Sequence, residues 1–195
     1  DLYQVHWPDW DTPVDETYAA MAELREEGKI RHIGVSNFGP RDLADWSTAG
    51  ETVSNQLGYN LLFRALEYEI MPACEERNAG IITYMPLMQA LLTGRWNSVD
   101  EIPVSRRRTR HFSSEREGTR HGEPGCEELT MTTIRDVVAI AEDVGMAPAD
   151  MATAWILSRP AVSSVIIGGS RPAQVERNAR AAEIELDAEI VQRLD

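Results

Sequence analysis

Lysine is almost absent from this sequence: of the 19 basic residues, Lys29 alone is a lysine and the others are arginines. A mechanism that needs a buried lysine therefore has a single candidate. Cysteine is also scarce, because Cys74 and Cys126 are the only two. Two thiols far apart in a chain of 195 residues are typical of a reduced cytosolic protein rather than of a disulfide-stapled one. No Cys/His pair has the spacing of a zinc site, so no metal is expected.

The sequence also lacks long apolar runs and an excess of positive charge. We find no signal-peptide pattern and no hydrophobic stretch long enough to span a membrane. The formal net charge is −13, whereas a surface that binds nucleic acid or anionic lipid needs a basic field. We therefore expect a cytoplasmic protein that binds neither nucleic acid nor membrane. With 43% apolar residues, the chain can bury a sizeable core.

Short β-rich runs alternate with helical patterns along the whole chain. The runs lie at 1–8, 33–35, 52–57, 81–84 and 162–167, and the helical patterns at 15–28, 41–48, 68–79, 132–144, 148–157, 172–182 and 187–194. No hairpin signal separates the runs, so the pattern predicts an α/β protein with a parallel sheet. Closing an eight-stranded TIM barrel typically takes about 250 residues. We therefore expect an incomplete TIM (β/α)8-type barrel of about five βα units with its beginning absent.

Two stretches carry more specific expectations. Residues 88–130 show no periodicity and are rich in arginine, and a loop of this length in a compact domain is usually a functional lid or poorly ordered. Thr132 is a plausible cap for the helix that follows. The run 162–167 is the most apolar of the five, as expected for a parallel strand that is covered on both faces.

Each β-rich run ends in a polar or glycine-rich tip. The C-terminal ends of parallel strands in such a fold share one face, so the tips should meet there. His6 ends the first run. A lone histidine is often a satisfied structural residue, but a neutral imidazole here could donate a hydrogen bond to a substrate carbonyl oxygen and stabilise the charge that develops on it. Trp7 would supply an apolar wall.

The middle tips carry uncharged polar groups. Ser36, Asn37 and Gln56 could simply cap and close turns, or they could hold a carboxamide, which offers one acceptor and two donors. Tyr84 is either an ordinary core aromatic residue or a flat platform for a planar ring.

The last tip, Gly-Gly-Ser-Arg-Pro at 168–172, opens a helix. Its glycines would let backbone amides approach an anion at the helix N-terminus, and Arg171 could hold an additional phosphate through two hydrogen bonds. This is not the Gly-x-Gly-x-x-Gly fingerprint. The loop after the eighth strand of a barrel is nevertheless a frequent phosphate site.

Taken together, these segments resemble the aldo-keto reductases, which are NAD(P)H-dependent oxidoreductases built on a TIM barrel. The resemblance covers essentially the whole chain and starts at what would be the fourth strand of the family. The matching stretches are 1–8 (DLYQVHWP), 28–38 (GKIRHIGVSNF), 55–56 (NQ) with 59–60 (YN), 84–87 (YMPL) with 91–94 (LLTG), and 165–171 (VIIGGSR) with Gln174 and Asn178.

The resemblance implies a role for each matched residue. His6 matches the active-site histidine of the family, and Trp7 matches its neighbour in the substrate pocket. The nicotinamide carboxamide would be held by Ser36, Asn37 and Gln56, with the ring of Tyr84 stacked on the nicotinamide. Pro86 and Leu87 would line the pyrophosphate. The region around the adenosine phosphate would comprise Gly169, Ser170, Arg171, Gln174 and Asn178.

Further details follow from the same resemblance. Arg171 suggests NADP(H) rather than NAD(H), and residues 88–130 match the long loop after the seventh strand, a flap over the cofactor. The family usually has serine at the position of Met85, often has glycine at that of Ala90, and commonly has proline at that of Ile167. These departures could alter the fit of the phosphates.

The leading hypothesis is that residues 1–195 form a partial aldo-keto reductase barrel whose parent reduces an aldehyde or ketone by hydride transfer from NADPH. The family's proton-donating tyrosine and its aspartate and lysine partners would lie outside the chain, so the isolated chain should be inactive. One alternative is a non-catalytic NADP-binding module, or a split-barrel subunit completed by a complementing N-terminal segment. Another is an unrelated phosphate-binding barrel. An open sheet edge also predicts self-association unless a partner covers it.

Overall fold

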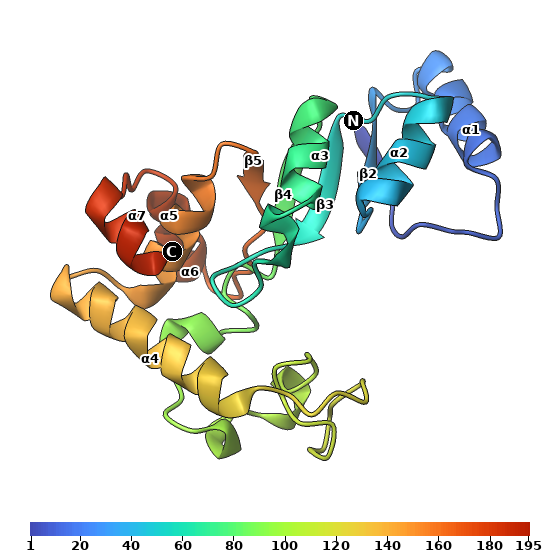
Figure 1. Cartoon of the computed structure of the whole chain (residues 1–195). Helices are drawn as coiled ribbons and strands as arrows, with labels where there is room; N and C mark the ends of the chain where they lie inside the picture. The colour runs from blue at the N-terminus through green and yellow to red at the C-terminus, as the bar shows by residue number, and fades with distance from the viewer. The chain divides into compact units, whose positions relative to one another are not determined.

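A computed structural model describes all residues from 1 to 195. Five strands form one sheet in the order β1-β2-β3-β4-β5 (Figure 1). They are β1 (Leu2–Val5), β2 (His32–Ser36), β3 (Ser54–Gly58), β4 (Gly80–Tyr84) and β5 (Val162–Val165). Every neighbouring pair is parallel, which confirms the predicted α/β class. The outer strands β1 and β5 are not paired with each other, so the sheet is an incomplete barrel.

The chain divides into two compact units. The first comprises residues 1–59, 63–84 and 157–166 and holds the sheet, α1 (Val14–Glu26), α2 (Pro40–Ala49), the short 3-10 turn η1 (Ala65–Glu67) and α3 (Ile70–Glu76). The second comprises residues 60–62, 85–156 and 167–195. It holds the 3-10 turns η2 (Leu91–Thr93), η3 (Val99–Glu101) and η4 (Val104–Arg106), α4 (Glu127–Asp143), most of α5 (Pro148–Leu157), α6 (Pro172–Ala181) and α7 (Ala188–Leu194).

The two faces of the sheet differ because side chains alternate along each strand. On the face toward the helices of the first unit, Ile33, Val35, Leu57 and Ile81 are at most 6% exposed, and the polar residues Asn55 and Thr83 are buried beside them. The other face has mostly small and polar residues on β2 and β3: Gly34, Ser36, Ser54, Gln56 and Gly58. A Cβ added at Gly34 would lie only 2.5 Å from Ser54 Oγ and 2.9 Å from Gln4 Cγ, so no larger residue fits there without displacing its neighbours.

Aromatic rings join α1 and α2 in the first unit. Tyr18 meets Trp46 edge-on with ring centroids 5.4 Å apart, and Phe38 meets the same indole at 5.6 Å. The start of α2 is fixed by Asp42, whose carboxylate accepts a hydrogen bond from the Gly39 N–H at 2.8 Å. These contacts set the position of the chain that follows β2.

The second unit has its own core. Apolar residues from α4, α5 and the chain around η2 are buried in it: Leu91, Leu92, Ile134, Val137, Ala141, Met151, Trp155 and Ile156. Arg193 of α7 forms an ion pair with Asp143 of α4 at 2.8 Å. No helix of either unit is long and apolar enough to cross a membrane.

The predicted helix at 68–79 is longer than α3. The helix ends at Glu76 because Asn78 adopts a left-handed conformation with φ of 53°, and the Ala79 N–H donates to the Cys74 carbonyl at 2.9 Å. Asparagine tolerates this conformation at helix ends, so Asn78 rather than Gly80 stops the helix.

The start of α4 also differs from the position that the sequence predicts. The helix begins at Glu127, five residues before the expected cap at Thr132. The Glu127 carboxylate accepts hydrogen bonds from the Ser113 N–H at 2.9 Å and from the Arg116 side chain. A carboxylate in the first turn also complements the helix dipole, and contacts with an earlier segment therefore set this boundary.

The segment 88–130 contains three 3-10 turns and the first residues of α4. His111 donates from Nε2 to the Leu62 carbonyl at 3.0 Å, and the Cys126 N–H donates to the His111 carbonyl at 2.9 Å. Arg106 reaches the Gln89 carbonyl at 2.6 Å. Hydrogen bonds between distant residues thus replace regular secondary structure in this loop.

The expectation that the last strand is covered on both faces is wrong. Ser163 and Ser164 at its centre are exposed, and Val162 and Val165 are only half-buried. β5 pairs with β4 alone, so it is an edge strand, and polar residues suit an edge. The strand also ends at Val165, two residues earlier than predicted.

Candidate functional site

The carboxyl ends of β1 to β4 lie along one rim of the sheet in the first unit. His6 directly follows β1, and Tyr84 ends β4. The register pairs Ser36 of β2 with Gln56 of β3. The Gln56 carbonyl accepts hydrogen bonds from the Asn37 N–H and from Ser36 Oγ, both at 2.9 Å. The structure therefore assembles these predicted residues from four neighbouring strands.

Asn37 is at the centre of this rim. Its Nδ2 donates to the His6 carbonyl at 2.9 Å and to Ser36 Oγ at 3.0 Å, and its Oδ1 accepts from the Tyr84 hydroxyl at 2.7 Å. The backbone φ of 62° is left-handed, a conformation that asparagine adopts more readily than most residues. One side chain thus links the ends of β1, β2 and β4.

Tyr84 is half-buried and packs against β3. A Cβ added at Gly58 would lie 3.2 Å from carbons of the tyrosine ring, so glycine permits this close approach. Burial raises the pKa of the Tyr84 phenol. The phenol therefore stays protonated over the physiological range and acts as the donor in its hydrogen bond to Asn37.

Two other side chains at the rim remain available to a ligand. No hydrogen bond within the protein engages the imidazole of His6 or the carboxamide of Gln56. His6 is exposed, and the centroid of its ring lies 6.0 Å from that of Trp7. The Trp7 side chain is 57% exposed.

The predicted phosphate-binding residues lie in the second unit, in the turn before α6. Gln174 Oε1 accepts from the Ser170 N–H at 2.9 Å and from Ser170 Oγ at 3.1 Å, and Asn178 donates to the Gly168 carbonyl at 3.2 Å. A Cβ at Gly169 would lie 2.9 Å from a methyl group of α6. The turn is therefore tied closely to the first turns of its helix.

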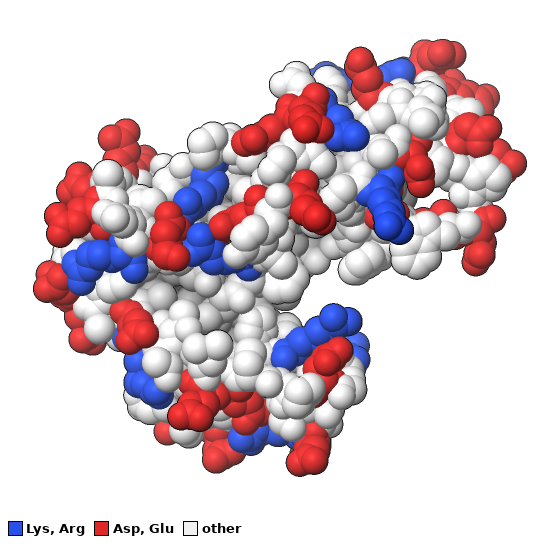
Figure 2. Space-filling view, in the orientation of Figure 1, with Lys and Arg blue, Asp and Glu red and all other residues white.

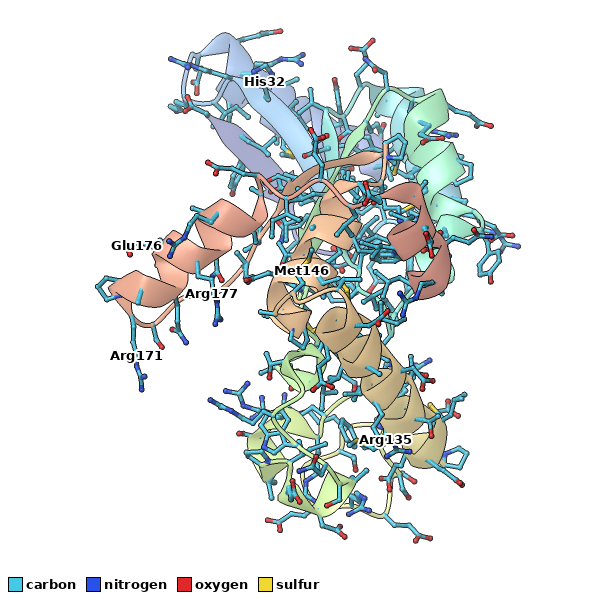
Figure 3. All side chains as sticks on the ribbon, turned by 90° about the vertical axis from the view of Figure 1, so that its left-hand side faces the viewer. His32, Arg135, Met146, Arg171, Glu176 and Arg177 are labelled. Carbon is cyan, nitrogen blue, oxygen red and sulfur yellow. The ribbon has the colours of Figure 1, made fainter.

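Arg171 is the residue that caps α6, and it is exposed. Figure 3 shows it at the end of this helix, with Glu176 and Arg177 farther along. Arg177 lies 3.6 Å from the Asp150 carboxylate, whereas Arg171 forms no ion pair within the protein. Its guanidinium can therefore bind an anion.

The residues after β4 form a strained turn at the start of the second unit. Pro86 is buried and Leu87 half-buried, and left-handed residues flank them: Met85, Met88, Gln89 and Ala90, with φ between 45° and 75°. Glycine adopts this conformation without strain. Glycine would therefore fit the position of Ala90, with its φ of 75°, with less strain than alanine.

The family resemblance included Asn60 but assigned no role to this residue, which organises the turn. Asn60 is fully buried, donates to the Met85 carbonyl at 2.9 Å and accepts from the Leu62 N–H at 2.9 Å. An asparagine two residues after a strand is a signal for such a turn. The bond between Tyr84 and Asn37 has no comparable signal. No group of three His, Cys, Asp or Glu side chains could hold a metal ion.

Comparisons with known proteins agree with this architecture. An NADH-specific methylglyoxal reductase of Escherichia coli (strain K12) is 32% identical over 193 residues, covering 95% of this chain and 55% of that protein. A putative voltage-gated potassium channel subunit beta of Schizosaccharomyces pombe is 30% identical over 204 residues, covering 100% and 58%. The chain thus spans little more than half the length of these relatives.

Solved structures give the same result. A glycerol dehydrogenase of Gluconobacter oxydans superposes with a TM-score of 0.82 at 27% identity, covering 100% of this chain and 57% of that one. The model of the aldo/keto reductase family matches residues 1–195. The predicted resemblance is therefore confirmed, and the chain belongs to the aldo/keto reductase family.

Proposed function

We propose that the protein reduces an aldehyde or ketone with a nicotinamide cofactor, and that the rim of the first unit is its reaction site. The observation that supports this most directly is the joining of four strand ends through Asn37, which places His6, Gln56 and Tyr84 at one rim. Membership of the aldo/keto reductase family gives this arrangement a chemical context.

His6 is proposed to bind the substrate carbonyl. Its imidazole is exposed and makes no hydrogen bond within the protein, so a ring N–H can donate to the carbonyl oxygen. Such a donor stabilises the negative charge that develops on that oxygen as the carbonyl C=O bond order falls. Trp7 would form an apolar wall beside it. The Asn37 hydrogen bond to the His6 carbonyl holds the backbone of this residue in place.

The chemistry of the rim fits a primary carboxamide. The Gln56 side chain offers an amide with no partner inside the protein. Asn37 Oδ1 accepts a hydrogen bond from the Tyr84 hydroxyl, and the N–H group of a carboxamide could donate to the same oxygen in its place. We therefore propose that Ser36, Asn37 and Gln56 hold the nicotinamide carboxamide and that Tyr84 moves from Asn37 to stack on the ring. When bound, the reduced nicotinamide supplies the hydride.

The second unit is proposed to hold the phosphates. Pro86 and Leu87 would line the pyrophosphate, and residues 88–130 would cover the cofactor as a flap. The adenosine phosphate would lie near Gly169, Ser170, Arg171, Gln174 and Asn178. Because Arg171 is exposed and unpaired, we propose a preference for NADP(H) over NAD(H). The Escherichia coli relative, by its name, is NADH-specific, so this preference needs its own test.

Coenzyme preference tests the role of Arg171. In Arg171→Ala of the full protein that contains this chain, kcat/KM for NADPH should fall by about tenfold or more, because one charge-assisted hydrogen bond contributes roughly 1.5–3 kcal/mol, while kcat/KM for NADH changes little. Arg180→Ala, an exposed arginine in the last turn of the same helix, is the matched control. Equal losses with both coenzymes in Arg171→Ala would refute the proposed phosphate contact.

Substitution of His6 tests the reaction itself. In the full protein, His6→Ala should lower kcat/KM for an aromatic aldehyde by about a hundredfold, with little change in NADPH affinity measured by fluorescence titration. The name of the Schizosaccharomyces pombe relative, a channel subunit, favours a second candidate, a nucleotide-binding module without turnover. Saturable NADPH binding with no aldehyde reduction in the full protein would support that module and exclude the reductase.

A further inference from the structure

The first unit contains a cavity that none of the proposed site residues lines. It has a volume of about 230 Å³ and lies between the connection from β1 to α1 and the helices α1 and α2. Aromatic rings of Trp10, Phe38 and Trp46 line it, together with the aliphatic side chains of Val5 and Val14. None of these residues belongs to the proposed reductase site, so the cavity needs a separate explanation.

The charged groups around this cavity are of one sign. Asp9, Asp42 and Asp45 line it, and no basic residue does. An open hollow beside it adds one further carboxylate, Glu69, and one base, Arg41. Carboxylates therefore clearly outnumber bases here, and Figure 2 shows acidic side chains spread over the part of the molecule that α1 and α2 form.

Two indoles give the cavity its shape. Trp10 is 86% exposed, and its Nε1 donates to Asp42 at 3.0 Å, which ties the connection from β1 to α2. Trp46 is 2% exposed, yet its indole N–H has no hydrogen-bond partner. An unpaired buried donor is uncommon in folded proteins, and the face of an aromatic ligand ring is a weak acceptor for such an N–H group.

We propose that this cavity binds a small organic ammonium ion with an apolar body. Aromatic faces attract a cation within about 6 Å of the ring centre, and the carboxylates select positive charge. An apolar cavity of about 150 Å³ accommodates benzene, whereas drug-sized ligands occupy about 300–1,000 Å³. The cavity therefore suits a single ring with a short aminoalkyl chain.

Protonated phenethylamine is a suitable probe, and phenethyl alcohol and phenylpropanoate are its neutral and anionic analogues. Isothermal titration at pH 7 should give saturable binding of the amine, about tenfold tighter than the alcohol, and no binding of the acid. Binding should weaken as salt is added, since partly exposed charges are screened. Equal affinity for the amine and the alcohol would show an apolar cavity that does not select a positively charged ligand, and it would overturn the proposal.

Variants locate the binding site. Asp45→Asn should weaken amine binding about fivefold or more, and because the Asp45 side chain makes no hydrogen bond within the protein, the fold should be unaffected. Trp10→Ala should weaken binding similarly. Asp136→Asn on α4 and Tyr68→Ala at an 83% exposed position are the matched controls. Unchanged affinity in both cavity variants would place the amine elsewhere and refute the assignment.

Discussion

Replacing Asn37 tests whether one side chain holds the strand ends together. Its carboxamide makes three hydrogen bonds, each with a net contribution of about 0.5–1.5 kcal/mol. Asn37→Gly keeps the backbone freedom required by the φ of 62° and removes the hydrogen bonds, with a smaller added cost from the greater flexibility of the unfolded chain. We expect it to lower the free energy of unfolding by about 2 kcal/mol. Asn37→Ala adds the strain of a left-handed alanine and should cost about 3 kcal/mol.

The assay is equilibrium unfolding in urea followed by tryptophan fluorescence. Tyr84→Phe removes one of the three hydrogen bonds and should cost about 1 kcal/mol. The free energy of unfolding of the double variant Asn37→Gly/Tyr84→Phe should lie within about 0.5 kcal/mol of that of Asn37→Gly, because the shared hydrogen bond is lost only once. An alanine variant as stable as the glycine variant, or a glycine variant as stable as the wild type, would refute the reasoning.

Three other substitutions and one control variant test separate contacts, each by urea unfolding. Gly125→Ala should cost about 2–3 kcal/mol, because φ is 76° and the new Cβ would lie 2.5 Å from backbone atoms. Gly122→Ala, with nothing within 4 Å, should change stability by less than about 0.5 kcal/mol, and equal effects would contradict this account. Ser54→Ala should be neutral or stabilising by up to about 1 kcal/mol, since its buried Oγ has no partner; a clear loss of stability would show an unrecognised bond. Arg116 lowers the pKa of Glu127 below its ordinary 4.5, so Glu127→Gln should lower the free energy of unfolding by about 1 kcal/mol at neutral pH. This difference should vanish as the pH falls through the lowered pKa of Glu127. A difference that persists in acid would exclude the ion pair as its cause.

Local patterns predicted most of the fold. The β-rich runs and the alternation of strands with helices identified the parallel sheet, because each signal lies within a few residues of the element it describes. The position of the rim residues was also predicted, since the carboxyl ends of parallel strands lie at the same edge of the sheet. His6, Asn37 and Gln56 lie at the rim, as their positions at strand ends predict.

The errors arose where distant residues decide the outcome. The start of α4 depends on Arg116 and Ser113, which bind Glu127 from an aperiodic segment. The exposure of β5 depends on its place at the edge of the sheet, which the composition of the strand does not reveal. The hydrogen bond between Tyr84 and Asn37 joins residues 47 positions apart, and no local pattern predicts such a pair.

The unlike faces of the sheet also protect it from misalignment. If β2 slid by one residue, Ile33 and Val35 would turn away from the helices, and Gly34 would take a place in the apolar layer. Two aliphatic side chains would then lose their cover, at roughly 1.5–3 kcal/mol each, and their bulk would collide with Ser54 and Gln4 on the opposite side. The glycine that leaves room for its neighbours thus also disfavours a one-residue shift in the pairing of this strand.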